Sequence, residues 1–397
     1  MSKSFDAVVT QEQELFAPGV RRWPLALERG DGSLVYDVDG QEYLDLTAGW
    51  GVTCLGHSHP ELAEAIADQA RTLMQTTNVV YSRPQLELAE RLASIMPDQI
   101  HRSFFVSSGA EANEGALKLA HRSTGRSRFV ATVNSFHGRT LGAMSVLGQE
   151  KYRARWSGLI RENTFVPYGD LDAAKAAIDD DVAAMIVEPV QGEGGVNVPP
   201  DGYLTSLADA CHAAGALLIL DEVQTCIGRT GRWMALEHSG VLPDIVTLGK
   251  GLGGGVPLAA FMATDHVMSS IEPGDHGGTY AGNLLTCRAG ATVLRIIEEQ
   301  GLVERAARLG EHVLSRFGAL AESESDKVEA VRGVGLLVGL VLRDAEAAAL
   351  MHSGLRDAGL LVNLTADRVL RIFPALNIPE AELDRGLDLI EDAVEKG

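Results

Sequence analysis

Lys250 stands in the run Gly249-Lys250-Gly251, directly after the short apolar stretch 244–248. Glycines on both sides leave room for a lysine to enter a pocket, where a lowered pKa makes its amine a nucleophile toward carbonyl groups. The alternative is a phosphate-binding loop of the form Gly-x-x-x-x-Gly-Lys-Ser/Thr. Gly251 follows Lys250, and no glycine-rich loop of that spacing precedes it, so we reject the phosphate-loop alternative.

Acidic residues follow two further apolar stretches. Asp221 comes directly after residues 216–220, and Glu188 comes after residues 183–187, ahead of a glycine-rich loop that contains Glu193. A carboxylate at the end of a buried strand is costly unless it meets a cation. A protonated pyridine nitrogen is one such cation, whereas the structural alternative for Asp221 is a helix cap. The acid before the glycine-rich loop is by itself a weak signal.

Two other apolar stretches end in residues that could bind an anion or a flat ring. Residues 107–114 combine small side chains with a helix start, whose N–H groups and dipole suit phosphate, although a plain serine cap is an equal alternative. After residues 128–133, Phe136 could stack on a ring and Arg139 could pair with a carboxylate. A loop arginine taken alone is more often a solvated surface charge.

The elements that carry these residues are short apolar runs that alternate with helical stretches. This alternation predicts an α/β fold with a mainly parallel sheet and helices on both faces. Ligands of such sheets bind beyond the carboxyl ends of the strands, so we expect the residues above to meet at one edge. The predicted strands span residues 103–106, 128–133, 183–187, 216–220 and 244–248.

The two ends of the chain predict a smaller domain. Residues 34–46 alternate apolar and polar side chains around Asp39-Gly40, which indicates a hairpin. Residues 327–340 indicate a second, smaller sheet. We divide the chain into an N-terminal segment (1–60), a large domain (61–285) and a C-terminal domain (286–397). Further expected elements are helices at 61–75 and 85–95, a helical stretch after 285, short strands at 360–363 and 369–372, and a closing helix from about 380.

Composition narrows the range of partners and compartments. The chain has 397 residues, 46% of them hydrophobic, and a formal net charge of −20. An acidic surface repels nucleic acid and anionic membranes, so we expect neither as a partner. The four cysteines show no paired spacing, which indicates free thiols and no metal site. Without an apolar signal core or a membrane-length apolar run, the sequence predicts a cytoplasmic protein.

Together these segments resemble the class III, or omega, aminotransferases, a family of fold-type I enzymes that use pyridoxal 5'-phosphate. The resemblance covers nearly the whole chain and implies a large mainly parallel sheet plus a smaller α+β domain built from both chain ends. The motifs that carry it are Gly56-His57-Ser58-His59-Pro60, Ser108-Gly109-Ala110-Glu111-Ala112-Asn113-Glu114, Phe136-His137-Gly138-Arg139-Thr140, Glu188-Pro189-Val190-Gln191-Gly192-Glu193-Gly194-Gly195, Leu220-Asp221-Glu222-Val223-Gln224-Thr225, Gly228-Arg229-Thr230-Gly231 and Leu248-Gly249-Lys250.

The resemblance implies a role for each residue of the cofactor site. Lys250 would hold the cofactor as a Schiff base and shuttle a proton, and Asp221 would keep the pyridine nitrogen protonated. The other cofactor-binding residues contact the phosphate, the ring faces and the ring hydroxyl. They are Ser108, Gly109 and Ala110 for the phosphate, Phe136, His137 and Val223 around the ring, Gln224 for the hydroxyl, and Thr279 for the phosphate of a neighbouring subunit. A homodimer with shared active sites follows from the last of these roles.

The resemblance also implies how two substrates use one site. Arg139 resembles the arginine that binds the substrate α-carboxylate, and Arg371 resembles a second carboxylate-binding arginine. Glu193 would neutralise Arg371 while an omega-amino donor is bound and release it for 2-oxoglutarate or glutamate. Gly278 is also expected to contact substrate. An aminomutase or racemase of the same fold would need no such exchange, and a non-catalytic relative would lack Lys250 or Asp221.

Within the family, the chain is most similar to the branch that acts on N2-acetyl-L-ornithine, with ornithine and 4-aminobutyrate aminotransferases close by. This similarity predicts transfer of a terminal amino group to 2-oxoglutarate in a ping-pong reaction that gives L-glutamate and a semialdehyde. Trp50 departs from the family, whose members have small or aliphatic residues or tyrosine in this segment of the substrate entrance. The exact donor is therefore open between N-acetylornithine, ornithine, 4-aminobutyrate and other diamines or omega-amino acids.

Overall fold

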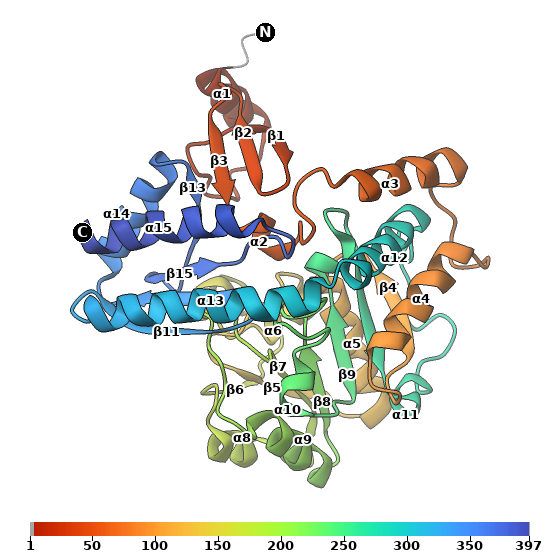
Figure 1. Cartoon of the computed structure of the whole chain (residues 1–397). Helices are drawn as coiled ribbons and strands as arrows, with labels where there is room; N and C mark the ends of the chain where they lie inside the picture. The colour runs from red at the N-terminus through yellow and green to blue at the C-terminus, as the bar shows by residue number, and fades with distance from the viewer. Residues whose placement is uncertain (1–3, 397) are drawn as a thin grey trace.

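A computed structural model describes residues 4–396. Its centre is a seven-stranded sheet in the order β4-β10-β9-β8-β7-β5-β6 (Figure 1). Only β10 runs antiparallel to its neighbours, so the prediction of a mainly parallel sheet is confirmed. The strands are β4 (Arg102–Val106), β5 (Arg128–Thr132), β6 (Thr164–Val166), β7 (Val182–Val187), β8 (Leu217–Asp221), β9 (Ile245–Leu248) and β10 (Ala259–Ala263).

Helices cover both faces of this sheet, as the continuous apolar strands require. Alternate strand residues belong to two separate cores: Leu218 and Leu220 pack in one, and Ile219 packs in the other with residues of α5 (Gly109–Thr124). The first core also contains residues of α4 (Arg83–Ile95), α9 (Tyr203–Ala213) and α12 (Leu284–Glu299). Other helices of this part are α3 (Pro60–Thr72), α6 (Leu141–Ser145), α7 (Glu150–Arg153), α8 (Leu171–Ala177), α10 (Leu236–Ser239) and α11 (Asp265–Met268).

Two smaller sheets contain the remaining strands. The expected hairpin at Asp39-Gly40 is confirmed, because β2 (Leu34–Asp37) pairs antiparallel with β3 (Glu42–Asp45). That sheet has the order β1-β2-β3-β13, so β13 (Leu360–Leu361) joins the C-terminal segment to strands from the N-terminal one. The other sheet has the order β11-β12-β15-β14. Its strands are β11 (Val328–Val334), β12 (Leu337–Leu342), β14 (Asn363–Thr365) and β15 (Val369–Ile372), and β1 spans Leu27–Asp31.

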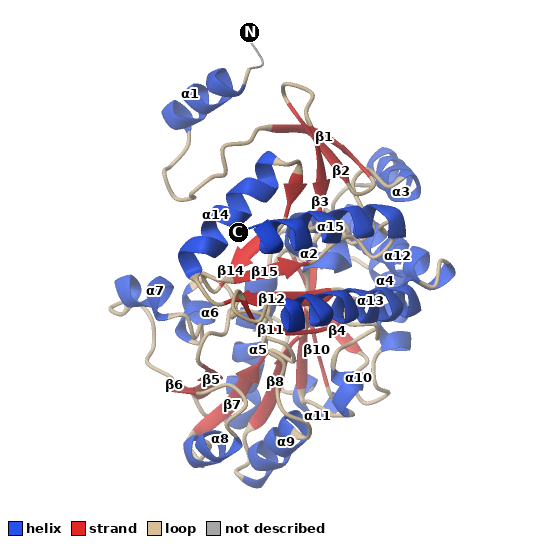
Figure 2. Cartoon of the chain, turned by 60° about the vertical axis from the view of Figure 1, so that its left-hand side comes forward, coloured by secondary structure: helices blue, strands red, loops and turns tan. Residues whose placement is uncertain are grey.

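Long helices pack on these smaller sheets. They are α13 (Leu302–Ser323), α14 (Ala345–Asp357) and α15 (Glu380–Lys396), as expected for a helical C-terminal part. Figure 2 shows α1 (Phe5–Leu15) standing apart from the body of the molecule, and α1 buries none of its residues. The domain boundaries at 60 and 285 stay predictions. Within residues 4–396, no helix combines the length and apolar character needed to cross a membrane.

Two strands of the large sheet were not predicted from the sequence. One of them, β6, has three residues, which is too short for a clear apolar run. The other, β10, reads Ala-Ala-Phe-Met-Ala, and small residues of this kind have low strand propensity. Tertiary pairing with β4 and β9 on either side overrides this low propensity.

Candidate active site

The carboxyl ends of the parallel strands bring the predicted residues to one edge of the sheet. Asp221 ends β8, and Lys250 follows β9 after a single glycine. Phe136 and Glu188 follow β5 and β7, and Ser108 follows β4. These segments are separated by up to about 140 positions in the sequence, and only the parallel arrangement brings them together.

Lys250 begins a single 3₁₀ turn (Lys250–Gly253) with φ of 45°, a left-handed conformation that is strained for a non-glycine residue. Its ammonium forms no hydrogen bond or ion pair with the residues that the structure describes. Burial lowers the pKa of Lys250 to about 8, while the nearby carboxylate of Glu193 acts in the opposite direction and Arg371 adds to the lowering. More of the amine is therefore neutral near physiological pH than in an ordinary lysine, although the protonated form still predominates.

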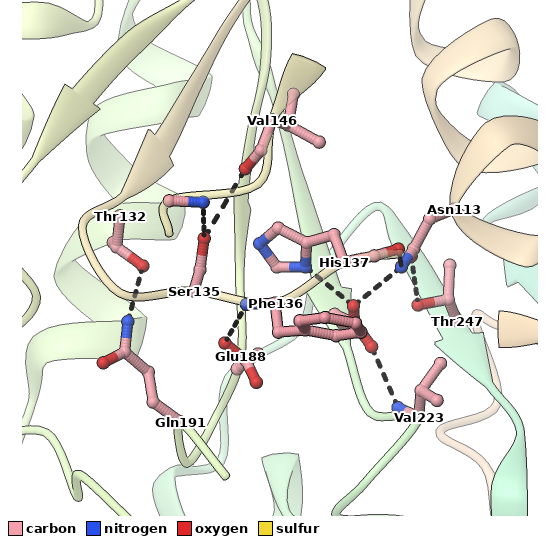
Figure 3. Close-up of polar contacts among 12 residues, drawn as sticks. Asn113, Thr132, Ser135, Phe136, His137, Val146, Glu188, Gln191, Val223 and Thr247 are labelled. Carbon is pink, nitrogen blue, oxygen red and sulfur yellow. Dashed lines mark hydrogen bonds and ion pairs between the residues drawn. The ribbon is translucent and has the colours of Figure 1, made fainter. Parts of the chain in front are cut away.

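Asp221 is buried and accepts hydrogen bonds from several groups (Figure 3). Its Oδ2 lies 2.7 Å from Nδ1 of His137 and 2.8 Å from Nδ2 of Asn113, and its Oδ1 accepts the N–H of Val223 at 3.0 Å. Residues 222–235 form turns and bends, so the alternative that Asp221 caps a helix is wrong. The carboxylate is instead held by donors at the edge of the sheet.

Helix α5 begins where the anion site was predicted. Ser108 is its N-cap, and the serine Oγ accepts the N–H of Glu111 at 3.3 Å, so the plain capping role is present. Gly109 and Ala110 are the first residues of the helix, and N–H groups at such positions have no intrahelical acceptor. An added Cβ at Gly109 would lie 2.7 Å from Cγ1 of Val223, so only glycine permits this approach.

Aromatic residues line the segment after β5. Phe136 is half-buried, and its backbone N–H donates to Oε2 of Glu188 at 3.1 Å. The ring of Tyr152 meets that of Phe136 edge-on, with centroids 6.4 Å apart. Arg139 is exposed, and its guanidinium lies 4.5 Å from the Tyr152 ring centroid. Burial and the charge of Asp221 raise the pKa of Glu188 well above its usual range.

Arg371 and Glu193 form an ion pair in which the arginine is buried and the glutamate is half-buried. The guanidinium of Arg371 is fully buried, and its Nη1 lies 2.7 Å from Oε1 of Glu193. Gln224 lies between them, accepting from Arg371 at 3.1 Å and donating to Glu193 at 3.1 Å. Asn363 accepts a further bond from Arg371 at 3.0 Å. Both polar ends of Gln224 are used here, and its contact with a ring hydroxyl stays a prediction.

A cavity of about 720 Å³ opens beside Glu193. It is lined by Asn134 and Tyr152 from the large sheet side and by residues 364–367 from the β14–β15 hairpin. Asn134, Ala366 and Asp367 all have positive φ. Ala366 and Asp367 lie in the turn between β14 and β15, where positive φ is typical of a tight hairpin.

Three predicted residues lie farther from this cluster. Gly278 and Thr279 are exposed, and the Thr279 carbonyl accepts a hydrogen bond from Gln75 at 2.6 Å. Trp50 is 48% exposed with φ of 61°, and its ring centroid lies 6.3 Å from that of Trp23. Thr279 lines a smaller cavity of about 310 Å³ together with Ser107 and Glu111, beside the start of α5.

Sequence reasoning missed the polar residues that support the site. Asn113 bonds to Asp221, Thr247 bonds to Asn113, and Tyr152 lies beside Arg139. One signal was available, because Asn113 follows Gly109 by four positions and shares its helix face with buried alanines. Tyr152 carried no such signal.

The residues present fit pyridoxal phosphate, judged by the chemistry of their groups. Lys250 offers a partly neutral amine for an aldehyde, and Asp221 offers a buried carboxylate for a pyridine nitrogen. The first turn of α5 offers N–H groups for a phosphate, and the missing Cβ of Gly109 leaves the space needed beside Val223.

Comparisons with known proteins agree with this fit. The family model for class-III aminotransferases matches residues 15–394. The acetylornithine aminotransferase of Methanothermobacter thermautotrophicus is 43% identical over 97% of each chain, and that of Mycobacterium tuberculosis is 47% identical over 91% of this chain and 89% of its own. The structure of ornithine aminotransferase from Toxoplasma gondii superposes with a TM-score of 0.94 at 31% identity, covering 100% of this chain and 96% of that one.

A further neighbour is the acetylornithine aminotransferase of Elizabethkingia anophelis, with a TM-score of 0.86 and 31% identity over 100% of both chains. Another structure of the Toxoplasma gondii enzyme has pyridoxal phosphate in partial occupancy at its active site. The match to the family model and the identity to these relatives both extend over most of the chain. The chain therefore belongs to the class-III aminotransferases and is a pyridoxal-phosphate-dependent enzyme that moves an amino group from an amino donor to a keto acid.

Proposed function

We propose that the enzyme transfers the terminal amino group of N2-acetyl-L-ornithine to 2-oxoglutarate, giving L-glutamate and a semialdehyde. The observation that carries this proposal is the ion pair of Glu193 and Arg371 beside the Lys250 amine. The names of relatives that are 40–47% identical support the choice of donor.

The pair explains how one site serves two unlike substrates. 2-Oxoglutarate and glutamate carry a second carboxylate, which an arginine binds well. An omega-amino donor has no carboxylate at its reacting end and would leave Arg371 unpaired. A buried charge without a partner costs about 3–5 kcal/mol. Glu193 can supply the missing partner in that half-reaction and leave when a substrate carboxylate arrives.

We assign the chemical roles as follows. Bound pyridoxal phosphate supplies a ring that withdraws electrons from the reacting carbon. Lys250 holds the cofactor between turnovers and moves the proton at the amine-bearing carbon through its Nζ. The carboxylate of Asp221 keeps the ring nitrogen protonated. Phe136 and Val223 enclose the ring, His137 supports Asp221, and Ser108, Gly109 and Ala110 bind the phosphate.

The remaining residues orient the substrates. Arg139, exposed beside Tyr152, would bind the α-carboxylate of the donor by bidentate hydrogen bonds. Gly278 would contact the substrate from the exposed segment before Thr279. Gln224 would reach the ring hydroxyl after releasing one of its present partners, Arg371 or Glu193.

We further infer a homodimer with shared active sites. Exposed apolar side chains form a surface on two segments, residues 73–81 and the segment around residue 280. A hydrogen bond from the side chain of Gln75 to the Thr279 carbonyl joins these segments. Exposure of such residues is typical of a protein–protein interface. Thr279 on this surface would reach the phosphate in the partner's site. The exposed apolar residues are Leu73, Met74, Val79, Val80, Tyr81 and Tyr280.

Sedimentation of the holoenzyme tests the dimer. The wild type should sediment as a dimer. Tyr81→Asp replaces a fully exposed ring on this surface with a charge, so this variant should give monomers with weakened cofactor binding. An active wild-type monomer would exclude shared active sites.

The four buried free thiols also fit our proposal of a reducing cytoplasmic location.

A panel of donors tests the substrate. The enzyme with 2-oxoglutarate should show its highest kcat/KM with N-acetylornithine among four donors: N-acetylornithine, ornithine, 4-aminobutyrate and lysine. A higher kcat/KM for ornithine or 4-aminobutyrate would change the assigned donor but would leave the assignment as an aminotransferase in place. Failure to form glutamate from any omega-amino donor would instead overturn the two-substrate account of Glu193 and Arg371.

A further inference from the structure

Two buried polar side chains with no role so far, Asn113 and Thr247, lead to the carboxylate of Asp221. Thr247 is fully buried, and Asn113 is 1% exposed. An amide and a hydroxyl in such a core are costly unless they are hydrogen bonded, so their pairing has to be specific.

The sheet register places both side chains beside Asp221. Asp221 of β8 and Thr247 of β9 are direct partners in the parallel pairing. Paired residues of neighbouring strands project to the same face, so the Thr247 hydroxyl and the Asp221 carboxylate lie on one side of the sheet. Asn113 reaches both from α5, which packs on that side.

Figure 3 shows dashed lines that join Thr247 to Asn113 and Asn113 to the carboxylate that His137 and Val223 also contact, and the atoms involved give these bonds one direction. The hydroxyl of Thr247 donates to Oδ1 of Asn113 at 2.8 Å. Nδ2 of Asn113 then donates to Oδ2 of Asp221 at 2.8 Å and to the His137 carbonyl at 2.7 Å. A rotated amide would turn its oxygen toward two acceptors. The two acceptors therefore set the direction of the Asn113 amide, and the Thr247 hydroxyl holds the amide oxygen from the other side.

We propose that Asn113 and Thr247 are positioning residues that hold the Asp221 carboxylate in the orientation needed to accept a bond from the ring nitrogen of the cofactor. The proposal rests on the role assigned to Asp221 above. The amide of Asn113 and Nδ1 of His137 both contact Oδ2 of Asp221, and the N–H of Val223 donates to Oδ1, so the carboxylate is held at both oxygens. Loss of the Thr247 hydroxyl leaves the amide oxygen of Asn113 without its donor, which loosens the amide and weakens its bond to Asp221.

Thr247→Val removes the hydroxyl while keeping the shape of the side chain. The variant should lower kcat by about tenfold with little change in KM, because the effect falls on the reaction rather than on substrate binding. It should also shift the pH at which the absorbance of the lysine-bound cofactor changes. Thr247→Ser should restore both properties. Thr292→Val on α12, which also removes a buried hydroxyl, should leave them unchanged.

The same substitution in an Asp221→Ala background separates this proposal from the assignment of Asp221. If Thr247 acts through Asp221, Thr247→Val should have no further effect on kcat once Asp221 is absent. An equal loss in both backgrounds, or no rescue by Thr247→Ser, would overturn the positioning role. If Asp221→Ala alone keeps wild-type kcat, the assignment of Asp221 fails instead.

Discussion

Glu193 and Arg371 are 178 positions apart in the chain, yet their side chains form an ion pair of 2.7 Å beside Lys250. Glu193 lies in the loop after β7, and Arg371 lies on β15 of the smaller C-terminal sheet. The pair thus joins the two parts of the molecule beside the Lys250 amine. The Nε of Arg371 is buried and has no hydrogen-bond partner among residues 4–396.

Glu193→Gln should separate the two half-reactions. Loss of the carboxylate leaves Arg371 without its partner, so the half-reaction with the omega-amino donor should slow by about tenfold. The half-reaction with glutamate should be kept or become faster, because Arg371 no longer has to be released. Single-turnover absorbance changes of the bound cofactor measure each half. Equal slowing of both would show that Glu193 is a structural loop acid.

Arg371→Met should impair the half-reaction with 2-oxoglutarate more than the half-reaction with the donor, the opposite of Glu193→Gln. The methionine keeps much of the apolar stem but cannot bind the second carboxylate of 2-oxoglutarate. We expect KM for 2-oxoglutarate to rise by about a hundredfold, while the donor half-reaction changes less. Steady-state titration of 2-oxoglutarate at saturating donor measures this change. An unaltered KM would place the carboxylate contact elsewhere.

The lowered pKa of Lys250 predicts a pH dependence in the enzyme freed of cofactor. Only the neutral amine reacts with aldehydes, so reductive methylation of Lys250 should rise with pH and level off above about 8. Free lysine in the same mixture should keep rising toward about 10.4. Glu193 raises the pKa of Lys250, so Glu193→Gln should move the midpoint to lower pH. Mass spectrometry of the Lys250 peptide follows the reaction.

A midpoint that stays in place or moves upward in Glu193→Gln would contradict the electrostatic contact between the two residues. Arg371→Met is the matched comparison for this experiment. The guanidinium of Arg371 lowers the pKa of Lys250, so its removal should move the midpoint to higher pH.

Gly109→Ala should weaken cofactor binding. The new methyl would lie 2.7 Å from Cγ1 of Val223. Either Val223 would have to move toward the cofactor ring, or the start of α5 would have to move away from the cofactor phosphate. We expect the dissociation constant for pyridoxal phosphate to rise by about tenfold or more, measured by titration of the apoenzyme. Gly318→Ala on α13, where an added Cβ meets nothing within 4 Å, is the control and should bind normally. Normal binding by Gly109→Ala would remove Gly109 from the phosphate site.

Much of the fold could be predicted because its signals are local. The apolar runs that became β5, β7, β8 and β9 are each followed directly by a polar residue or glycine, and such endings mark strand termini in parallel sheets. The Asp39-Gly40 turn is equally local. β10 could not be predicted, because its small residues become a strand only through pairing with β4 and β9.

The support of the site depends on register and packing, which single positions do not reveal. Thr247 is one threonine in an apolar strand, and only its pairing with Asp221 places it beside that carboxylate. Gln224 was expected at the ring hydroxyl, and the structure shows in addition that it bridges Glu193 and Arg371. Contacts between residues that are far apart in sequence become visible only in three dimensions.

The most direct test is to locate the covalent bond between enzyme and cofactor. The holoenzyme is reduced with borohydride, digested and analysed by mass spectrometry, and Lys250→Ala is treated in parallel. We expect a pyridoxyl adduct on the peptide that contains Lys250 in the wild type and none in Lys250→Ala, which should also lose turnover. An adduct on any other lysine, or turnover by Lys250→Ala, would contradict the assignment of Lys250 as the cofactor-binding lysine.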